Sequence, residues 1–139
     1  MNEQYISEAF EMANTAIALD AAGDRREARL TWQKASDHAD AHLVGEDIYF
    51  WIKSGLGAAL FEEGDYERSV VVSRLALDWC LKINQPLPSL TIAKACLKLG
   101  DRQGAVAHVR AAHRLIGDDV FDQLDPADRE VMRRESRTG

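Results

Sequence analysis

His38 and His42 have the spacing in this sequence that comes closest to a metal-binding pair. They are four positions apart, beside Asp37 and Asp40, so a helix that continued this far would place both imidazoles on one face. Two histidines on one face can supply part of a zinc site. The chain offers no further ligands at a convincing spacing, and histidines near a helix end interact favourably with its negative dipole. We therefore expect no metal and no cofactor.

Motifs that carry catalysis are absent from the sequence. It contains no Gly-rich phosphate loop, no HExxH and no G-x-S-x-G. Carboxylates are plentiful, but none is paired in an apolar segment as acid–base catalysis would require. Cys80 and Cys96 lie in apolar helical pattern without a CxxC or metal-ligand spacing, so we expect buried, reduced thiols. The sequence thus predicts a protein that is not an enzyme and has no catalytic residue.

Composition and charge limit the class of partner. A chain of 139 residues with 46% hydrophobic and 29% charged residues fits one soluble globular domain, 1–139. Its formal net charge of −6 does not suit nucleic acid, whose phosphates require clustered Lys and Arg, but suits a basic protein. No apolar run approaches the ~20 residues of a membrane span. Glu3, Glu8 and Glu11 lie where a signal peptide is basic and then apolar, so we expect a cytoplasmic protein without a membrane partner.

Three Gly-Asp pairs mark the corners between the elements that would position any site. They are Gly23-Asp24, Gly64-Asp65 and Gly100-Asp101. Glycine adopts the left-handed conformation that ends a helix, and the aspartate that follows can cap the next helix. Together with the helical apolar periodicity, the pairs predict antiparallel hairpins at about 4–38, 47–83 and 88–116, with a connector at 39–46.

The C-terminal region predicts one more helical unit. Asp125-Pro126 has an N-cap residue followed by proline at the first helical position, which predicts a C-terminal cap at about 118–134. No segment shows sustained period-two alternation, so we expect no sheet. The fold class predicted is all-α.

Aligned on the three glycines, the hairpins carry small residues at the same positions. These are Ala16, Gly57 and Ala93 before the glycine, then Ala28, Ser69 and Ala105, and finally Ala35, Ala76 and Ala112 after it. Small side chains at fixed positions let two helices, and then successive hairpins, approach closely. The pattern therefore predicts an internal repeat.

This pattern resembles the tetratricopeptide repeat over roughly residues 9–117. The stretch Gly55-Leu-Gly-Ala-Ala-Leu-Phe-Glu-Glu-Gly-Asp-Tyr-Glu-Arg-Ser is the part most similar to the family. The resemblance implies a right-handed superhelical stack of three antiparallel hairpins (TPR-like) plus a C-terminal capping helix. The glycines are spaced unevenly and more widely than the family's ~34 residues, and the first repeat is degenerate at Thr15. An unrelated helical bundle, which also uses glycine corners and alanine seams, is the alternative.

The resemblance also implies a concave groove lined by the first helix of each hairpin. Its partner-binding candidates are Phe10 and Ile17 in the first repeat, Trp51, Ser54, Phe61 and Glu62 in the second, and Leu90, Lys94 and Lys98 in the third. The aromatic residues are candidate anchors, and the alternative is that Trp51 and Phe61 pack the core. The matching positions of the first two repeats are not basic, which argues against the carboxylate clamp of the chaperone-binding members.

These features predict a non-enzymatic protein–protein interaction module of a bacterial cytoplasm. The first hypothesis is a small adaptor or inhibitor, which resembles in size and acidity the immunity proteins that neutralise bacterial toxins. The alternative is a chaperone, because residues 51–70 and 88–105 resemble the central and third repeats of the type III secretion chaperones, which hold an extended effector segment in the groove. A homodimer is a further alternative, because little polar sequence precedes the first helix, and an uncapped first hairpin could pair with another copy.

Overall fold

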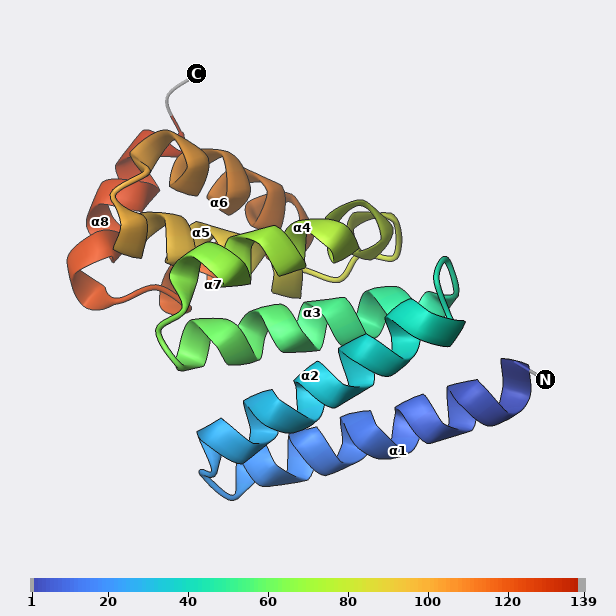
Figure 1. Cartoon of the computed structure of the whole chain (residues 1–139). Coiled ribbons are helices and arrows are strands. Elements are labelled where there is room, and N and C mark those ends of the chain that lie inside the picture. Colours follow the sequence, from blue (N-terminus) through green and yellow to red (C-terminus); the bar gives the residue numbers. More distant parts are fainter. Residues whose placement is uncertain (1, 138–139) are drawn as a thin grey trace.

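A computed structural model describes residues 2–137, and within this range it contains eight α-helices and no strand (Figure 1). The helices are α1 (Asn2–Ala21), α2 (Arg25–His42), α3 (Asp47–Glu62), α4 (Tyr66–Lys82), α5 (Leu87–Leu99), α6 (Arg102–Ile116), α7 (Asp119–Asp122) and α8 (Pro126–Glu135). They form three antiparallel hairpins, followed by the short α7 and by α8, which pack on α6. The predicted all-α stack with a C-terminal cap is confirmed. None of these helices is long and apolar enough to cross a membrane.

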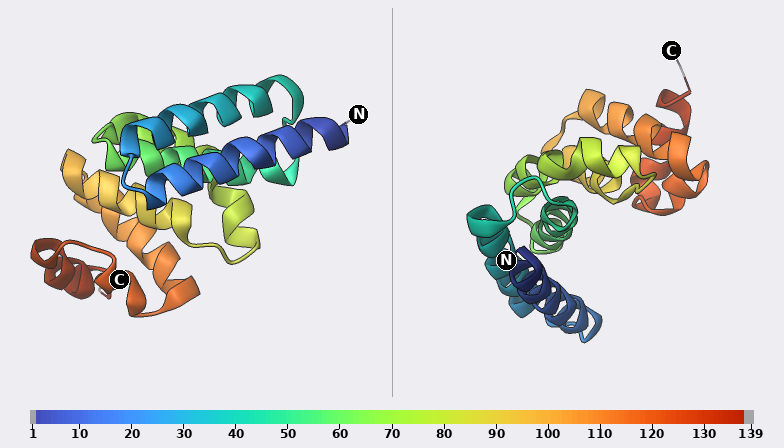
Figure 2. Two further views of the ribbon diagram at one scale, coloured as in Figure 1. Left: turned by 90° about the horizontal axis from the view of Figure 1, so that it is seen from below. Right: turned by 90° about the vertical axis from the view of Figure 1, so that its right-hand side faces the viewer.

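Successive hairpins pack side by side along the stack. Helix α2 packs on α3 and α4 packs on α5, while the first helix of each hairpin also contacts the first helix of the next. The right-hand view of Figure 2 shows the resulting arc, with blue α1 at one end and the orange and red C-terminal helices at the other. We call the face formed by α1, α3 and α5 the inner face.

The three Gly-Asp corners share one backbone geometry. Their glycines have φ values of 84°, 85° and 80°, in the left-handed region that residues with a side chain rarely adopt. In each corner the aspartate amide donates to a carbonyl of the preceding helix at 2.8–2.9 Å, and the aspartate side chain accepts from an amide of the next helix. The corners therefore end one helix and start another with the same bonds.

The small residues of the predicted seam are all buried. They are Ala16, Gly57, Ala93, Ala28, Ser69, Ala105, Ala35, Ala76 and Ala112. At Gly57 the close approach of α3 and α4 lets the Ser69 hydroxyl donate to the glycine carbonyl over 2.7 Å. A side chain at Gly57 would meet Ser73, with the new Cβ 3.3 Å from the Ser73 Cα. The seam thus keeps the helices close enough to bury both backbones.

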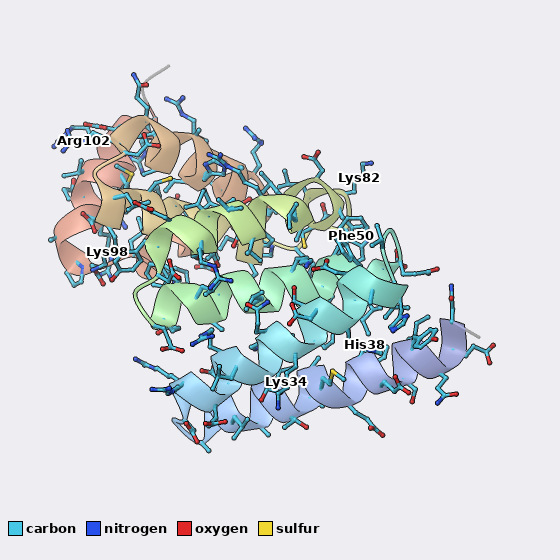
Figure 3. All side chains as sticks on the ribbon, viewed as in Figure 1. Lys34, His38, Phe50, Lys82, Lys98 and Arg102 are labelled. Atoms are coloured by element: carbon cyan, nitrogen blue, oxygen red, sulfur yellow. The ribbon has the colours of Figure 1, made fainter. Side chains whose placement is uncertain are left out.

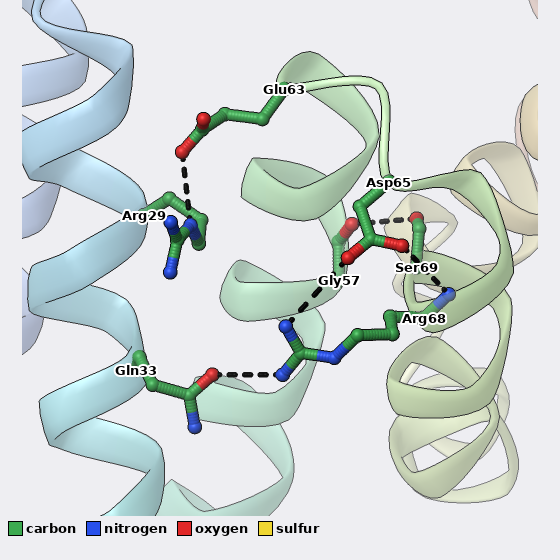
Figure 4. Close-up of polar contacts among 7 residues, drawn as sticks. All are labelled: Arg29, Gln33, Gly57, Glu63, Asp65, Arg68 and Ser69. Carbon is green, nitrogen blue, oxygen red and sulfur yellow. Dashed lines mark hydrogen bonds and ion pairs between the residues drawn. The ribbon is translucent and has the colours of Figure 1, made fainter.

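Polar bonds also tie the first hairpin to the second (Figure 4). Arg29 of α2 donates to Glu63 over 2.9 Å, and Arg68 of α4 donates to Gln33 of α2 over 3.1 Å. The Arg68 side chain is 53% exposed, and Arg29 and Glu63 are 24% and 27% exposed. Contacts of this kind near the surface contribute ~0–1 kcal/mol each. They orient α2 against the second hairpin more than they stabilise it.

The boundary predicted at the end of the first hairpin is wrong. The hairpin was expected to end near residue 38 with a connector at 39–46, but α2 continues to His42 and leaves 43–46 as the connector. Ala35, Ala39 and Leu43 are buried at four-residue spacing, so the apolar stripe runs further than the polar residues between them suggested. Tyr5 of α1 also stacks on His42, with the ring centroids 3.9 Å apart.

Both cysteines are expected to react slowly in the native state. Burial raises the pKa of the Cys80 thiol, and burial together with the nearby Asp101 carboxylate raises the pKa of Cys96. A raised pKa lowers the fraction of thiolate, which is the reactive form. Titration with a thiol reagent at neutral pH should therefore label both residues quickly only when denaturant is added. Rapid labelling of the native protein would show that the helices holding them open readily.

Candidate functional site

The inner face carries a run of aromatic rings from α1 to α3. The rings of Phe10 and Trp51 have centroids 5.6 Å apart, and Trp51 meets the ring of Trp32 edge-on at 6.0 Å. Trp32 is buried in the core, whereas the Phe10 side chain is 46% exposed and Trp51 is partly buried. Trp51 therefore packs on the core, as the alternative interpretation expected, and keeps part of its ring exposed, while its role as an anchor stays a prediction.

A hollow of about 350 Å³ lies between the N-terminal helices, and we call it the N-terminal hollow. It is lined by Ile6, Phe10, Glu46, Asp47, Ile48, Trp51 and Trp79. Five of these side chains are apolar or aromatic, and the two carboxylates lie together where α3 begins. The hollow can therefore take an apolar side chain, with a basic group beside it on the acidic rim.

Trp79 is a lining residue that the sequence analysis did not nominate. It lies on α4, where its indole Nε1 donates to Asp47 over 3.2 Å and its ring stacks on Phe50 at 5.7 Å. With Trp51 it also lines a second hollow of about 220 Å³, the middle hollow, which extends to the start of α5 at Leu87. The family pattern assigns the groove to the first helix of each hairpin, so a tryptophan on the second helix of a hairpin was missed.

A third hollow, of about 350 Å³, lies at the other end of α3, and we call it the C-terminal hollow. It is lined by Phe61, Glu62, Tyr66, Lys94, Leu97, Lys98, Gln123, Leu124, Asp125 and Asp128. The ammonium of Lys94 lies 4.8 Å from the centre of the Phe61 ring, within the range of a cation–π contact. Lys98 lies toward the C-terminal helices and Phe50 toward the opposite end of α3 (Figure 3).

The structure separates the nine predicted groove residues into three groups. Six line hollows from exposed or partly buried positions, and these are Phe10, Trp51, Phe61, Glu62, Lys94 and Lys98. Ile17 is 46% exposed on α1 but lines none of the hollows described above. Ser54 and Leu90 are both buried. Ser54 still lines the middle hollow, beside Cys80 of α4, whereas Leu90 lies within the C-terminal core.

His38 lies between α1 and α2 (Figure 3). His38 Nε2 is 3.0 Å from the Tyr5 carbonyl oxygen, which can only accept, so this nitrogen carries the proton. The His42 ring stacks on Tyr5. Across residues 2–137 no three His, Cys, Asp or Glu side chains are placed to hold a metal ion together.

Lys53 is a buried cation that the sequence analysis did not notice. Its side chain is 5% exposed, and its ammonium donates to the Ser36 hydroxyl over 2.6 Å and to the Asp40 carboxylate over 2.7 Å. Lys53 is the only basic residue in the apolar stretch from Ile48 to Phe61, and this was the sequence signal that could have identified it. This contact joins α3 to α2 beneath the inner face.

Comparison with known proteins bears on the fold. The chain is similar to a solved structure of PcrH in complex with the chaperone binding region of PopB, with a TM-score of 0.61 and 21% sequence identity. The similarity covers 94% of this chain and 92% of that chain, so it extends over all three hairpins and the C-terminal cap. No family model matches this chain, and no curated protein matches it either.

Proposed function

We propose that this protein is a chaperone-like binding module of the tetratricopeptide type, which holds an extended segment of a partner protein along its inner face and catalyses no reaction. The observation that carries the proposal is the row of hollows along α3, with partly exposed aromatic rings in its walls. The structure of PcrH contains a segment of a second protein, PopB, and this supports a chaperone role ahead of an inhibitor.

The spacing of the hollows sets the length of the segment. Trp51 and Phe61 are ten residues apart on α3, which corresponds to about 15 Å along the helix axis. An extended chain covers this distance in roughly five residues. A segment of that length or slightly more can place one apolar side chain at each end of α3, and side chains between them can reach the middle hollow.

Replacing Trp51 with alanine is the direct test of this proposal. Peptides selected from a random phage-displayed library against the whole protein would be titrated while tryptophan fluorescence is followed, since Trp51 and Trp79 both line the hollows. We expect Trp51→Ala to weaken binding by more than about 1 kcal/mol, because an aromatic anchor in a hollow carries a large share of the affinity. Fluorescence anisotropy of labelled peptides provides the same measurement for the variant.

Val71→Ala is the matched control for Trp51→Ala. Val71 is 64% exposed on α4 and lines none of the three hollows, so its removal should leave peptide affinity unchanged. Equal affinity of the wild type and Trp51→Ala would remove the inner face from the binding site. Both variants should first be shown to unfold at similar denaturant concentrations.

The net charge of −6 favours one other candidate, an inhibitor of a basic folded protein. An inhibitor should form a stoichiometric complex with a folded toxin and protect cells that express the toxin. It should also bind no short peptide. Selective binding of extended peptides therefore distinguishes the chaperone-like role from the inhibitor.

A further inference from the structure

Asp125 behaves differently from the three aspartates at the Gly-Asp corners. Asp24, Asp65 and Asp101 each accept a hydrogen bond from an amide in the first turn of the helix that follows. Asp125 occupies the same position before α8, but its side chain makes no such bond. Its carboxylate instead receives a hydrogen bond from Lys98 of α5 over 3.3 Å. The N-terminus of α8 is thus left without the cap that the sequence predicts.

The contact between Lys98 and Asp125 closes one side of the C-terminal hollow. Lys94 and Lys98 are four residues apart on α5 and so share a face of the helix, with Lys94 over the Phe61 ring. Asp125 and Asp128 lie opposite them, on the C-terminal cap. The hydrogen bond and the charge of Asp125 raise the pKa of Lys98. Asp125 therefore supplies the carboxylate that this part of the inner face attracts.

An exchange of carboxylates at Lys98 would cost little. The Lys98 and Asp125 side chains are 42% and 64% exposed, and ion pairs of such exposure are weak. If Asp125 were released, its carboxylate could accept a bond from the Ala127 amide in the first turn of α8. The Asp128 amide, which matches the donor at the three corners, already donates to the Asp125 backbone carbonyl over 2.9 Å. The new cap bond would offset the loss of the ion pair.

We propose that the C-terminal hollow is a subsite for one side-chain carboxylate of the bound segment, and that Asp125 occupies it until the segment arrives. This inference rests on the proposed function and adds the chemistry of the partner. The segment carries an acidic residue at the end that meets Lys98 and an apolar residue at the end that meets Trp51. Asp125 moves to cap α8 when the acidic residue replaces it.

A side chain fits this subsite better than the terminus of a chain. The inner-face positions of the first two hairpins that match Lys94 and Lys98 are Ile17, Ala21, Ala58 and Glu62, none of them basic. No second cation from those helices is therefore present to fix both oxygens of a terminal carboxylate. With Asp125 displaced, Lys94 and Lys98 are balanced by Glu62 and Asp128, so one incoming carboxylate restores the charge that Asp125 supplied and a second would add further repulsion. The subsite accordingly takes a single carboxylate.

Two short peptides test the subsite on the whole protein. The probes are acetyl-Leu-Ala-Ala-Ala-Ala-Glu-amide and acetyl-Leu-Ala-Ala-Ala-Ala-Gln-amide, whose end residues are five positions apart, enough to reach from Trp51 to the C-terminal hollow. The two peptides have the same shape and differ in one charge. In an NMR titration we expect the glutamate peptide to bind at least about threefold more tightly, the range of one exposed ion pair. It should also shift the amide signals of Ala127 and Asp128 in the first turn of α8, whereas the glutamine peptide should not.

Asp125→Ser separates the two roles of Asp125, since serine can cap a helix but carries no charge. This variant should bind the glutamate peptide about threefold more tightly than the wild type and the glutamine peptide equally well. Lys98→Met should remove the preference for glutamate. Equal affinity for the two peptides, no binding of either, or no effect of Asp125→Ser would overturn the inference.

Failure of the inference can be distinguished from failure of the proposed function. If both peptides bind equally and Trp51→Ala weakens both, the inner face binds segments but has no carboxylate subsite. If the glutamate preference persists while Trp51→Ala has no effect, the subsite exists and the extended-segment proposal is wrong. Each result answers one question only.

Discussion

Replacing Gly55 with alanine should lower the free energy of unfolding by about 2 kcal/mol, the usual range for overpacking a core. A Cβ at this position would lie 2.5–2.7 Å from three ring carbons of Trp32 (Cη2, Cζ3 and Cζ2), closer than carbon atoms approach in proteins. The ring is buried between α2 and α3 and meets Trp51 edge-on, so it has little room to move. Unfolding in urea followed by circular dichroism measures the change.

Whether Gly55→Ala lowers or raises the free energy of unfolding distinguishes the packing of Trp32 from helix propensity. Alanine is more favourable than glycine in a helix by about 1 kcal/mol, so propensity alone predicts a more stable protein. Ala18→Gly, at an exposed position of α1, measures that propensity without a packing change. A stabilised Gly55→Ala variant would show that the Trp32 ring does not lie against α3.

A second substitution at the contact makes the test sharper. Trp32→Phe in the Gly55→Ala background should recover part of the lost stability, because a smaller ring leaves room for the methyl group. A double-mutant cycle on the four proteins gives the coupling between the two positions. Because Trp32 contacts Trp51, Gly55→Ala should also alter the fluorescence of Trp51, which lines the N-terminal hollow. The same contact therefore links the packing of α2 to the binding surface.

Removing the carboxylate of Asp40 should destabilise the protein by about 2 kcal/mol, within the range for hydrogen bonds to charged groups. In Asp40→Ala the Lys53 ammonium loses its counter-charge and keeps the Ser36 hydroxyl and the Tyr49 ring, whose centre is 5.0 Å away, as partners. A buried charge without its counter-charge is costly. Guanidinium chloride unfolding of the wild type and the variant measures the difference.

Removing the lysine of this pair, in place of the aspartate, should change the free energy of unfolding much less. Lys53→Met removes the charge and keeps the length of the side chain, while Asp40 is 53% exposed and can be hydrated by water. Breaking an ion pair is costly when the remaining charge is buried, and the remaining Asp40 is not, so we expect a change below about 1 kcal/mol. Asp37→Ala, one turn earlier on the exposed side of α2, should change stability by less than ~0.5 kcal/mol. Equal losses for Asp40→Ala and Lys53→Met would contradict this account.

Much of the fold follows from local rules that can be applied to the sequence directly. Gly23, Gly64 and Gly100 could be assigned to corners because a left-handed φ is strained for other residues. The aspartates after them cap helices because a side-chain oxygen reaches a free amide only three residues away. The seam of small residues was found by aligning the three hairpins on these glycines, since only small side chains fit where helices touch.

The end of α2 shows where local rules stop being sufficient. Asp37, His38 and Asp40 suggested a polar connector, yet the helix continues because Ala39 and Leu43 are covered by other parts of the chain. Burial is decided by elements distant in sequence, so the apolar stripe outweighs the polar residues beside it. His42 lies in the last turn of α2, as the polar helix end implied, but only the tertiary structure brought Tyr5 to stack on it across the hairpin.

The sequence by itself determined most of the helices, their corners, the seam of small residues and the helix faces that are candidates for binding, because these depend on residues within a few positions of one another. The tertiary structure alone decided which of those faces stay open. It buried Ser54 and Leu90, brought Trp79 of α4 to the hollows beside Trp51, and directed Asp125 to Lys98 instead of to its own helix. Exposure and pairing are properties of neighbours in space, and these neighbours come from separate hairpins and from the C-terminal cap.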